Sequence, residues 1–302
     1  MIVVGAGIAG LAAGHTLSRQ GFYFQERETT SRALAQAVLA FGAHRSQTLA
    51  MAGGLGRLPT ALAATLDVAL ATPAIALTVE PDAVTVVTHE TRLVADHVVL
   101  ATTASVANRL FSTADEVERS LLAMAYSANL NLALVTRPEF RLPASLRAVY
   151  GLLVPRRERS HVAAIGIESN KCRDRAARGE LFNVMLAGNL SRDLMAEPET
   201  EIVQTILPEV ERLLPGISEQ IAAVRIYRWP EAEPLSPVGR AKDVRRYRER
   251  IAAAPCPRVL LAGDYLSMPF SEGAAESGIW AAQTIIRAHE KCRTPPADQV
   301  VK

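Results

Sequence analysis

The sequence begins with three glycines in the pattern Gly-x-Gly-x-x-Gly, directly after a short apolar run. The run, Ile2–Val4, is rich in β-branched residues, which is typical of a buried parallel strand. The glycines are Gly5, Gly7 and Gly10. In such a turn the first glycine lets the chain leave the strand sharply, the second lets a phosphate approach the backbone, and the third lets a helix pack closely. The pattern predicts the opening of a nucleotide-binding α/β fold.

The residues after the glycines extend this prediction. A helix is expected over 8–20, because Gly21 provides a stop, and a second strand over 22–26. Glu26 ends that strand where an acid would accept hydrogen bonds from ribose hydroxyls, which favours FAD or NAD over NADP. The predicted phosphate-binding turn consists of Gly5, Ala6, Gly7, Ile8, Ala9 and Gly10. An ordinary strand-turn-helix, with glycines that serve packing alone, is the alternative.

Composition excludes several classes of protein. The chain has 302 residues, of which 49% are hydrophobic and 21% charged, with a net charge of +2. This balance argues against a disordered chain and against a nucleic-acid-binding protein, which would carry a large basic excess. The length predicts one large domain or two closely associated ones.

The cysteines and the N-terminal residues indicate the cellular compartment in which the protein is expected. The three cysteines are widely spaced and odd in number, so they predict neither a disulfide framework nor a CxxC metal site. Residues 1–18 lack formal charge, but no basic residue precedes Arg19, as a signal peptide would require. No apolar run is long enough to cross a membrane. We therefore expect a cytoplasmic protein, and peripheral contact with a membrane surface stays open.

A second nucleotide-binding pattern lies near the far end of the sequence. Residues 259–262 read as another short buried strand, which Gly263-Asp264 closes. A loop then leads to Glu272-Gly273-Ala274-Ala275, which is expected to open a helix. The free N–H groups at such a helix start favour negative charge.

Together these segments carry a family resemblance. VVGAGIAGLAAGHTL…ER at the start and LLAGDYLSMPFSEGAAESGIWAA near the end resemble the FAD-dependent amine oxidase, protoporphyrinogen oxidase and phytoene desaturase superfamily. The resemblance implies that Gly263 and Asp264 bind the FAD pyrophosphate and ribityl region. It also implies that Gly273 and Ala274 present backbone N–H groups to the flavin ring, and that the backbone near Ala74 contacts adenine.

The sequence departs from this family at one place. Relatives carry a Gly-Gly-Arg loop shortly after the acid, and its arginine contacts the cofactor pyrophosphate. Here Glu26 is followed by Arg27-Glu-Thr-Thr-Ser-Arg32 instead, so Arg27 and Arg32 are the candidates to replace the missing charge. Part of the usual substrate domain is also absent. This leaves a smaller cap, an open flavin face, a site completed by a partner chain, or an inactive protein.

The expected fold class is α/β. A Rossmann-like FAD-binding domain, with a parallel sheet and helices, is assigned to 1–110 and 228–292. A smaller α+β substrate domain with an antiparallel sheet is assigned to 111–227, where 129–135 and 161–168 alternate as strands and 199–214 reads as an amphipathic helix. Residues 293–302 form a polar tail.

No catalytic side chain can be named, and no motif predicts a metal site. Trp229, Tyr265 and Trp280, together with Met268, are candidates to lie near the flavin or substrate, with core packing as the alternative for the aromatic residues. Two basic clusters, at 156–159 and 240–250, would suit a carboxylate-bearing substrate or an anionic lipid surface. A solvated helix face is the alternative for these clusters.

The sequence favours an FAD-dependent oxidoreductase that oxidises an apolar or amine-bearing small molecule by hydride transfer to flavin. The resemblance ranks a porphyrinogen-type substrate slightly above amine and polyene types. A non-catalytic or partner-dependent FAD-binding protein is the alternative, and an NAD-dependent dehydrogenase ranks third. The sequence leaves the oligomeric state open.

Overall fold

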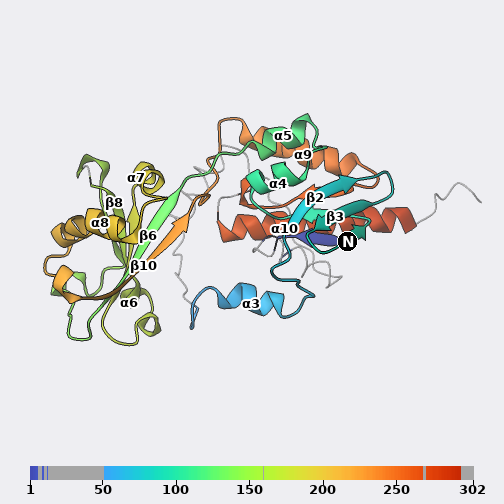
Figure 1. The fold of residues 1–302 in the computed structure, drawn as a ribbon. Coiled ribbons are helices and arrows are strands. Elements are labelled where there is room, and N and C mark those ends of the chain that lie inside the picture. Colours follow the sequence, from blue (N-terminus) through green and yellow to red (C-terminus); the bar gives the residue numbers. More distant parts are fainter. Residues whose placement is uncertain (6–8, 10–11, 13–50, 159, 268–269, 294–302) are drawn as a thin grey trace, which may run out of the picture. The chain divides into compact units, whose positions relative to one another are not determined.

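A computed structural model of the chain describes residues 1–5, 9, 12, 51–158, 160–267 and 270–293 (Figure 1). The chain divides into two compact units. Unit 1 comprises Met1–Gln47, Leu58–Ala125 and Pro234–Lys302, and unit 2 comprises Thr48–Arg57 and Tyr126–Glu233. The domain limits expected from the sequence, at 111 and 227, stay a prediction. Most of the expected helix over 8–20, the expected strand over 22–26 and the polar tail lie outside the described residues.

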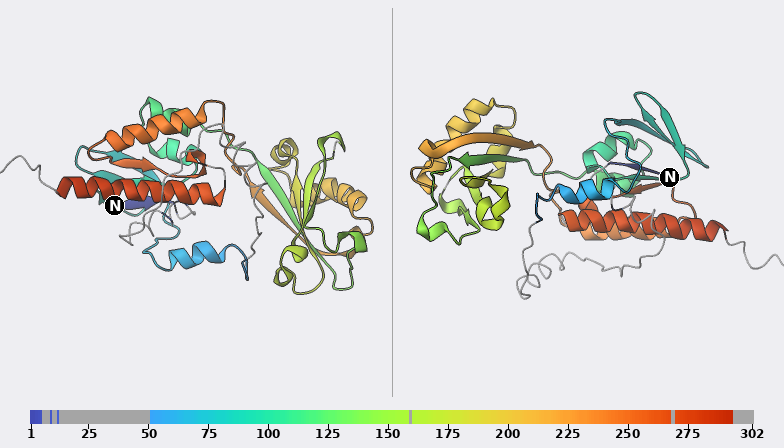
Figure 2. Two further views of the ribbon diagram at one scale, coloured as in Figure 1. Left: turned by 180° about the vertical axis from the view of Figure 1, so that it is seen from behind. Right: turned by 90° about the horizontal axis from the view of Figure 1, so that it is seen from below.

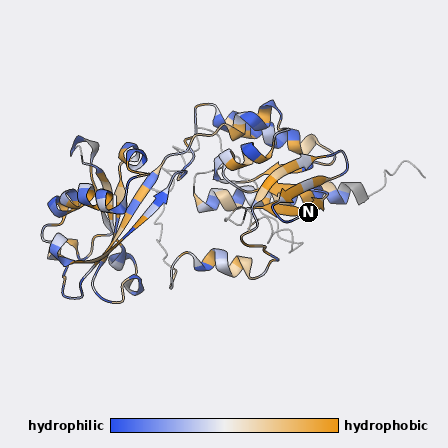
Figure 3. Cartoon of the chain, in the orientation of Figure 1, coloured by the Kyte–Doolittle hydropathy of each residue, from blue (hydrophilic) through white to orange (hydrophobic). Residues whose placement is uncertain are grey.

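Unit 1 contains a small parallel sheet whose strands come from distant parts of the sequence. Its order is β1 (Ile2–Val4), β5 (Val98–Leu100) and β11 (Val259–Leu261), and Val99 of β5 is opposite Val3 on one side and Leu260 on the other. Strands β5 and β11 are completely buried and entirely aliphatic, as parallel strands covered on both faces require. Figure 3 shows these strands as strongly apolar. The predicted combination of a small parallel sheet with antiparallel sheets is confirmed.

Unit 1 also contains four helices that follow or precede the strands of this sheet in the sequence. They are α4 (Ala104–Leu110), α5 (Glu116–Leu122), α9 (Arg240–Ala253) and α10 (Ser271–Arg293). Helices α9 and α10 flank β11 (Figure 2), and the rings of Tyr247 and Trp280 pack against each other with centroids 5.7 Å apart. The short 3-10 helix η5 (Asp264–Leu266) connects β11 to the loop before α10.

A second sheet of unit 1 is an antiparallel meander. It consists of β2 (Ala74–Val79), β3 (Val84–Thr88) and β4 (Arg92–Ala95), and Pro81-Asp82 lies in the turn between β2 and β3. Strand β4 leads through Asp96 and His97 directly into β5. Helix α3 (Arg57–Ala63) has no buried residue and begins at the boundary between the units.

Unit 2 is built on a five-stranded antiparallel sheet of order β10-β6-β9-β8-β7. Its strands are β6 (Asn129–Thr136), β7 (Gly151–Leu153), β8 (Val162–Ile167), β9 (Leu181–Leu186) and β10 (Ile221–Trp229). Strand β6 alternates strictly, so that Leu130, Leu132 and Leu134 are buried on one face. The alternation is visible as coloured stripes along β6 and β10 in Figure 3.

The core of unit 2 lies between this leucine face and helix α8 (Glu199–Leu213). Ile202, Ile206 and Val210 of α8 are completely buried in the same cluster as the three leucines. The predicted amphipathic helix is therefore present. The remaining short helices are α6 (Glu168–Lys171), α7 (Gly188–Asp193), η1 (Ala144–Leu146), η2 (Arg156–Glu158), η3 (Arg173–Arg175) and η4 (Ser218–Gln220).

Candidate cofactor site

The carboxyl ends of the three parallel strands bring the two predicted nucleotide-binding segments to one edge. The N–H of Ala101, just after β5, donates to Val4 O at 2.7 Å, and the N–H of Ala262 donates to Leu100 O at 2.9 Å. Gly5 and Gly263 therefore follow strands that lie on either side of β5. In open α/β sheets, ligands bind at this carboxyl edge.

Gly5 lies where only a glycine fits. Its φ is 110°, a backbone conformation that other residues rarely adopt. A Cβ atom at this position would lie 2.5 Å from the carbonyl oxygen of Ala101, which is backbone and cannot rotate away. The first glycine of the pattern thus has the role predicted for it, a close turn out of β1.

Gly263 makes a similar close approach to a side chain. Its φ is 156°, and a Cβ atom here would lie 2.5 Å from Cε1 of Tyr265. The ring of Tyr265 therefore lies against Gly263 and is 1% exposed, with the guanidinium carbon of Arg240 5.9 Å from the ring centroid. Tyr265 and Trp280 are buried, which agrees with core packing, whereas Trp229 is 53% exposed. Met268 lies outside the described residues.

The start of α10 is joined to the end of β11 by a residue that the sequence did not single out. Ser277 is completely buried, and its Oγ accepts a hydrogen bond from the N–H of Gly263 at 2.8 Å. The same hydroxyl donates to Ala274 O at 2.8 Å. Two segments that the resemblance assigns to the cofactor are thus linked through one hydroxyl group. In the sequence, the only sign of this role is that a serine lies one helical turn after Gly273-Ala274.

Gly273 and Ala274, the two residues predicted to face the flavin, differ in the hydrogen bonding of their backbone N–H groups. Gly273 is buried in the first turn of α10. The N–H of Ala274 already donates to Phe270 O at 3.0 Å, which closes that first turn. The first amides of a helix have no intrahelical partner, so the group best placed to donate to a ligand is Gly273 N–H.

In unit 2, the face of the sheet opposite the leucine core is polar and aromatic. We call it the outer face, and it includes Asn129 and Asn131 of β6, which pair across the strands with Trp229 and Tyr227 of β10. The Oδ1 atoms of both asparagines are shielded from solvent, and neither has a hydrogen-bond partner among the described residues. Both aromatic side chains are exposed. No motif in the sequence marks the two asparagines.

The sequence matches the family described as flavin containing amine oxidoreductase, over residues 10–286. The chain belongs to this family. No curated protein matches the sequence. Many solved structures are similar to the fold of this chain, among them the following three.

The first is a protein from Exiguobacterium sp. 255-15 that is assigned as a protoporphyrinogen oxidase, with TM-score 0.68, 21% identity, and coverage of 83% of this chain and 55% of that one. The second is cyclohexylamine oxidase from Brevibacterium oxydans IH-35A, with TM-score 0.61, 18% identity, and coverage of 80% and 53%. The third is a redesigned putrescine oxidase, with TM-score 0.59, 14% identity, and coverage of 78% and 53%. The chain thus spans about half the length of each of these three solved structures.

Several of the predicted cofactor residues lie outside the described residues. These are Ala6, Gly7, Ile8, Gly10, Glu26 and Arg27, together with Arg32. Ala9 is helical and buried, as the predicted helix after the glycine turn requires. Ala74 begins β2 in the antiparallel meander, opposite Thr88, and therefore belongs to a different sheet from Gly5 and Gly263.

The second basic cluster is only partly a solvated helix face. Lys242, Arg245 and Arg246 of α9 are exposed, as that alternative requires. Arg240 is buried, and Arg250 forms ion pairs with Asp115 and, at 2.6 Å, with the buried carboxylate of Glu118. In the first cluster, Arg157 is exposed, Arg159 lies outside the described residues, and the side chain of Arg156 is not described.

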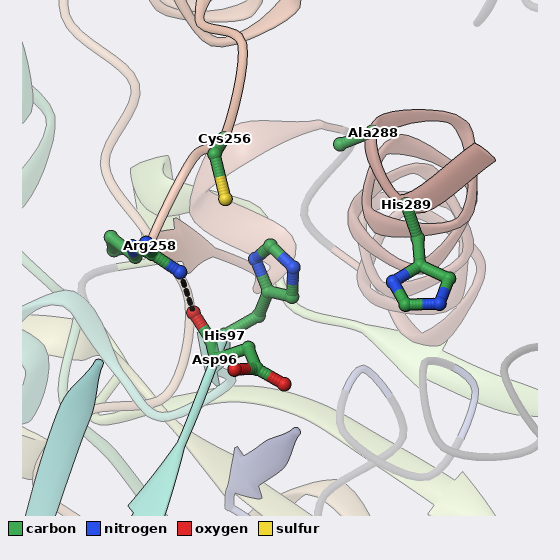
Figure 4. Close-up of a pocket in the computed structure, with 6 residues that line it drawn as sticks. All are labelled: Asp96, His97, Cys256, Arg258, Ala288 and His289. Carbon is green, nitrogen blue, oxygen red and sulfur yellow. Dashed lines mark hydrogen bonds between the residues drawn. The ribbon is translucent and has the colours of Figure 1, made fainter. Parts of the chain in front are cut away.

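A cavity of about 220 Å³ lies at the opposite edge of the parallel sheet (Figure 4). It is lined by Asp96, His97, Cys256, Arg258, Ala288 and His289. His97 precedes β5 and Arg258 precedes β11, so the cavity is at the amino ends of the strands. The ring Nδ1 of His97 is 2.8 Å from Pro257 O, and Arg258 donates to Asp96 O at 3.2 Å. This cavity is therefore separate from the glycine edge.

Two further features of the described residues bear on function. No group of three or more histidine, cysteine or acidic side chains among them is arranged to hold a metal ion. None of the described helices combines the length and apolarity needed to cross a membrane. The cytoplasmic location and the small-molecule partner expected from the sequence stay predictions.

Proposed function

We propose that this chain binds FAD at the carboxyl edge of the β1-β5-β11 sheet and acts as an FAD-dependent oxidoreductase. The observation that carries the proposal is that Gly5 and Gly263 follow strands on either side of β5 and lie at the same edge. The absence of a Cβ atom at Gly5 allows the turn to pass directly over Ala101 O. Family membership supports the same cofactor.

Different segments of the chain would bind different parts of FAD. The turn from Gly5 to Gly10 would hold the pyrophosphate at the start of its helix, and Glu26 would accept the ribose hydroxyls. Gly263 and Asp264 would bind the pyrophosphate and ribityl region, with Arg27 supplying positive charge. The backbone at Ala74 would contact adenine, and Gly273 with Ala274 would lie at the flavin ring.

We further propose that the substrate lies on the outer face of the unit 2 sheet and is apolar or amine-bearing. Trp229 and Tyr227 offer apolar area and, for a charged amine, an attractive ring face. FAD, when bound, would supply hydride acceptance. The chain's own residues would bind and orient the substrate.

A visible absorption spectrum of the purified protein, before and after addition of FAD, tests the cofactor assignment. The expected result is a yellow protein with flavin bands and quenched flavin fluorescence. A colourless protein that leaves FAD fluorescence unchanged would contradict the assignment.

Catalysis is tested by photoreduction of the bound flavin, an oxygen challenge, and a panel containing a porphyrinogen, a primary amine and a polyene. We expect reduction of the flavin by one member of the panel, with the porphyrinogen ranked first. A flavin that is bound but reduced by none of them would favour the alternative, a non-catalytic or partner-dependent FAD-binding protein. The half-length match to the solved oxidases is the observation that favours this alternative.

A further inference from the structure

We infer that Ser277 is a positioning residue that sets both the affinity for FAD and the reduction potential of the bound flavin. The inference rests on the proposed function and adds a residue that neither the sequence motifs nor the family match assigns. It is carried by the link that Ser277 makes between the end of β11 and the first turn of α10.

The geometry of this link is complete. The hydroxyl of Ser277 accepts one hydrogen bond, from Gly263 N–H, and donates one, to Ala274 O, each at 2.8 Å. Ser277 is completely buried, so water cannot replace either bond. Because Gly263 lacks a side chain, the ring of Tyr265 can lie directly against the strand end that makes this contact.

The two groups that Ser277 joins are the ones expected to touch different parts of the cofactor. Gly263 belongs to the segment expected at the pyrophosphate and ribityl chain, and Ala274 to the helix start expected at the flavin ring. Loss of the hydroxyl would leave Gly263 N–H buried without a partner, and the strand end or the helix start would have to shift. A shift at either place changes how the N–H groups near Gly273 face the ring.

Thr284 provides a matched control on the same helix. It is also buried, and its Oγ1 donates to a helix carbonyl, Trp280 O, at 2.8 Å. Among the described residues, its other hydrogen-bond partner is Arg287, which belongs to the same helix. Replacement of Thr284 by alanine therefore removes a buried hydroxyl from α10 without releasing β11.

The test compares wild type, Ser277→Ala, Ser277→Cys and Thr284→Ala as full-length chains. FAD dissociation constants are measured on apoprotein well below the lowest melting temperature, and flavin reduction potentials by dye equilibration. We expect the dissociation constant to rise about tenfold in Ser277→Ala, with a shifted potential. Ser277→Cys should give a dissociation constant and a potential between those of wild type and Ser277→Ala, because a thiol is a weaker hydrogen-bond donor and acceptor than a hydroxyl. Thr284→Ala should lower the melting temperature and leave the FAD dissociation constant and the flavin reduction potential close to those of wild type.

The outcomes separate this inference from the proposed function. If wild type binds FAD but Ser277→Ala and Thr284→Ala show the same affinity and potential, the role of Ser277 is overturned and the proposed function stands. If wild type binds no FAD, the proposed function and the role of Ser277 are both contradicted.

Discussion

The backbone N–H of Leu261 donates a hydrogen bond to the hydroxyl oxygen of Tyr247, at 2.7 Å. Leu261 is in β11, the last strand in the described order of the parallel sheet, so its outward N–H has no strand partner there. Tyr247 of α9 is completely buried, and this burial raises the pKa of its phenol, which therefore stays protonated. Helix α9 thus completes the hydrogen bonding of the strand that carries Gly263.

Removing this hydroxyl should destabilise unit 1. In Tyr247→Phe, Leu261 N–H is buried without a partner, and we expect the free energy of unfolding to fall by about 1–3 kcal/mol. The change is measured by urea denaturation in a Trp229→Phe background, where the emission of Trp280 reports unit 1 alone. Tyr227→Phe, at an exposed position, is the control and should change stability by under about 0.5 kcal/mol.

A side chain at Gly5 should disturb both the sheet edge and the cofactor. In Gly5→Ala the new methyl group would collide with Ala101 O, and the residue would keep a strained φ, which costs about 1–3 kcal/mol. We expect a lower melting temperature and a much lower ratio of flavin absorbance to protein absorbance after purification.

Gly54→Ala is the matched control for this change. Gly54 also has a positive φ, of 89°, but a Cβ atom there would have no neighbour within 4 Å. It should therefore show backbone strain without loss of flavin. Equal flavin content in Gly5→Ala and wild type would show that the turn after β1 does not hold the cofactor.

Unit 2 should lose stability in acid through Glu209. Burial by itself raises the pKa of this α8 carboxyl, but the hydrogen bonds that it accepts from the Ser160 hydroxyl and, at 2.8 Å, from the His161 N–H lower the pKa by more, so the net shift is downward. Because the folded pKa is depressed, the stabilisation is fully present above the ordinary pKa of a glutamate and is lost as the pH falls through the lower, folded value.

The comparison of wild type with Glu209→Gln tests this dependence. The stability advantage of wild type should be present at neutral pH and should shrink as the pH falls through the depressed pKa of Glu209. Trp229 emission in a Trp280→Phe background follows unit 2. A pH-independent difference between the two proteins would rule out a role for the Glu209 charge.

Trp229 should affect substrate binding rather than the flavin. If the substrate lies on the outer face, Trp229→Ala should raise KM about tenfold and leave kcat and flavin content nearly unchanged. Val238→Ala, at a fully exposed position of unit 1, is the control and should behave as wild type. A loss of kcat with an unchanged KM would place Trp229 outside the substrate surface.

Local patterns in the sequence were enough to predict a large part of the fold. The aliphatic runs at Ile2–Val4 and 259–262 predicted parallel strands, because strands buried on both faces need no alternation. Strict alternation over β6 and the helical periodicity of α8 predicted the two layers of unit 2. The resemblance of the two end segments predicted the family that the whole-sequence match confirms.

Other features could not be read from the sequence, because they depend on contacts between distant residues. Ser277 matters through its hydrogen bond to Gly263. Arg240 is buried close to the ring of Tyr265, although Lys242, Arg245 and Arg246 of the same helix are exposed. The pairing of Asn129 with Trp229 requires the register of β6 and β10. The limits of the domains and the cofactor contacts stay predictions.

The order of the parallel sheet also constrains how the chain can be made. On the ribosome, β5 emerges long before β11, and residues 126–233 of unit 2 intervene. The insertion can therefore reach its folded form while the edge of β5 that will pair with β11 is still bare. During that interval the unpaired edge of an aliphatic strand is open to pairing with neighbouring polypeptides.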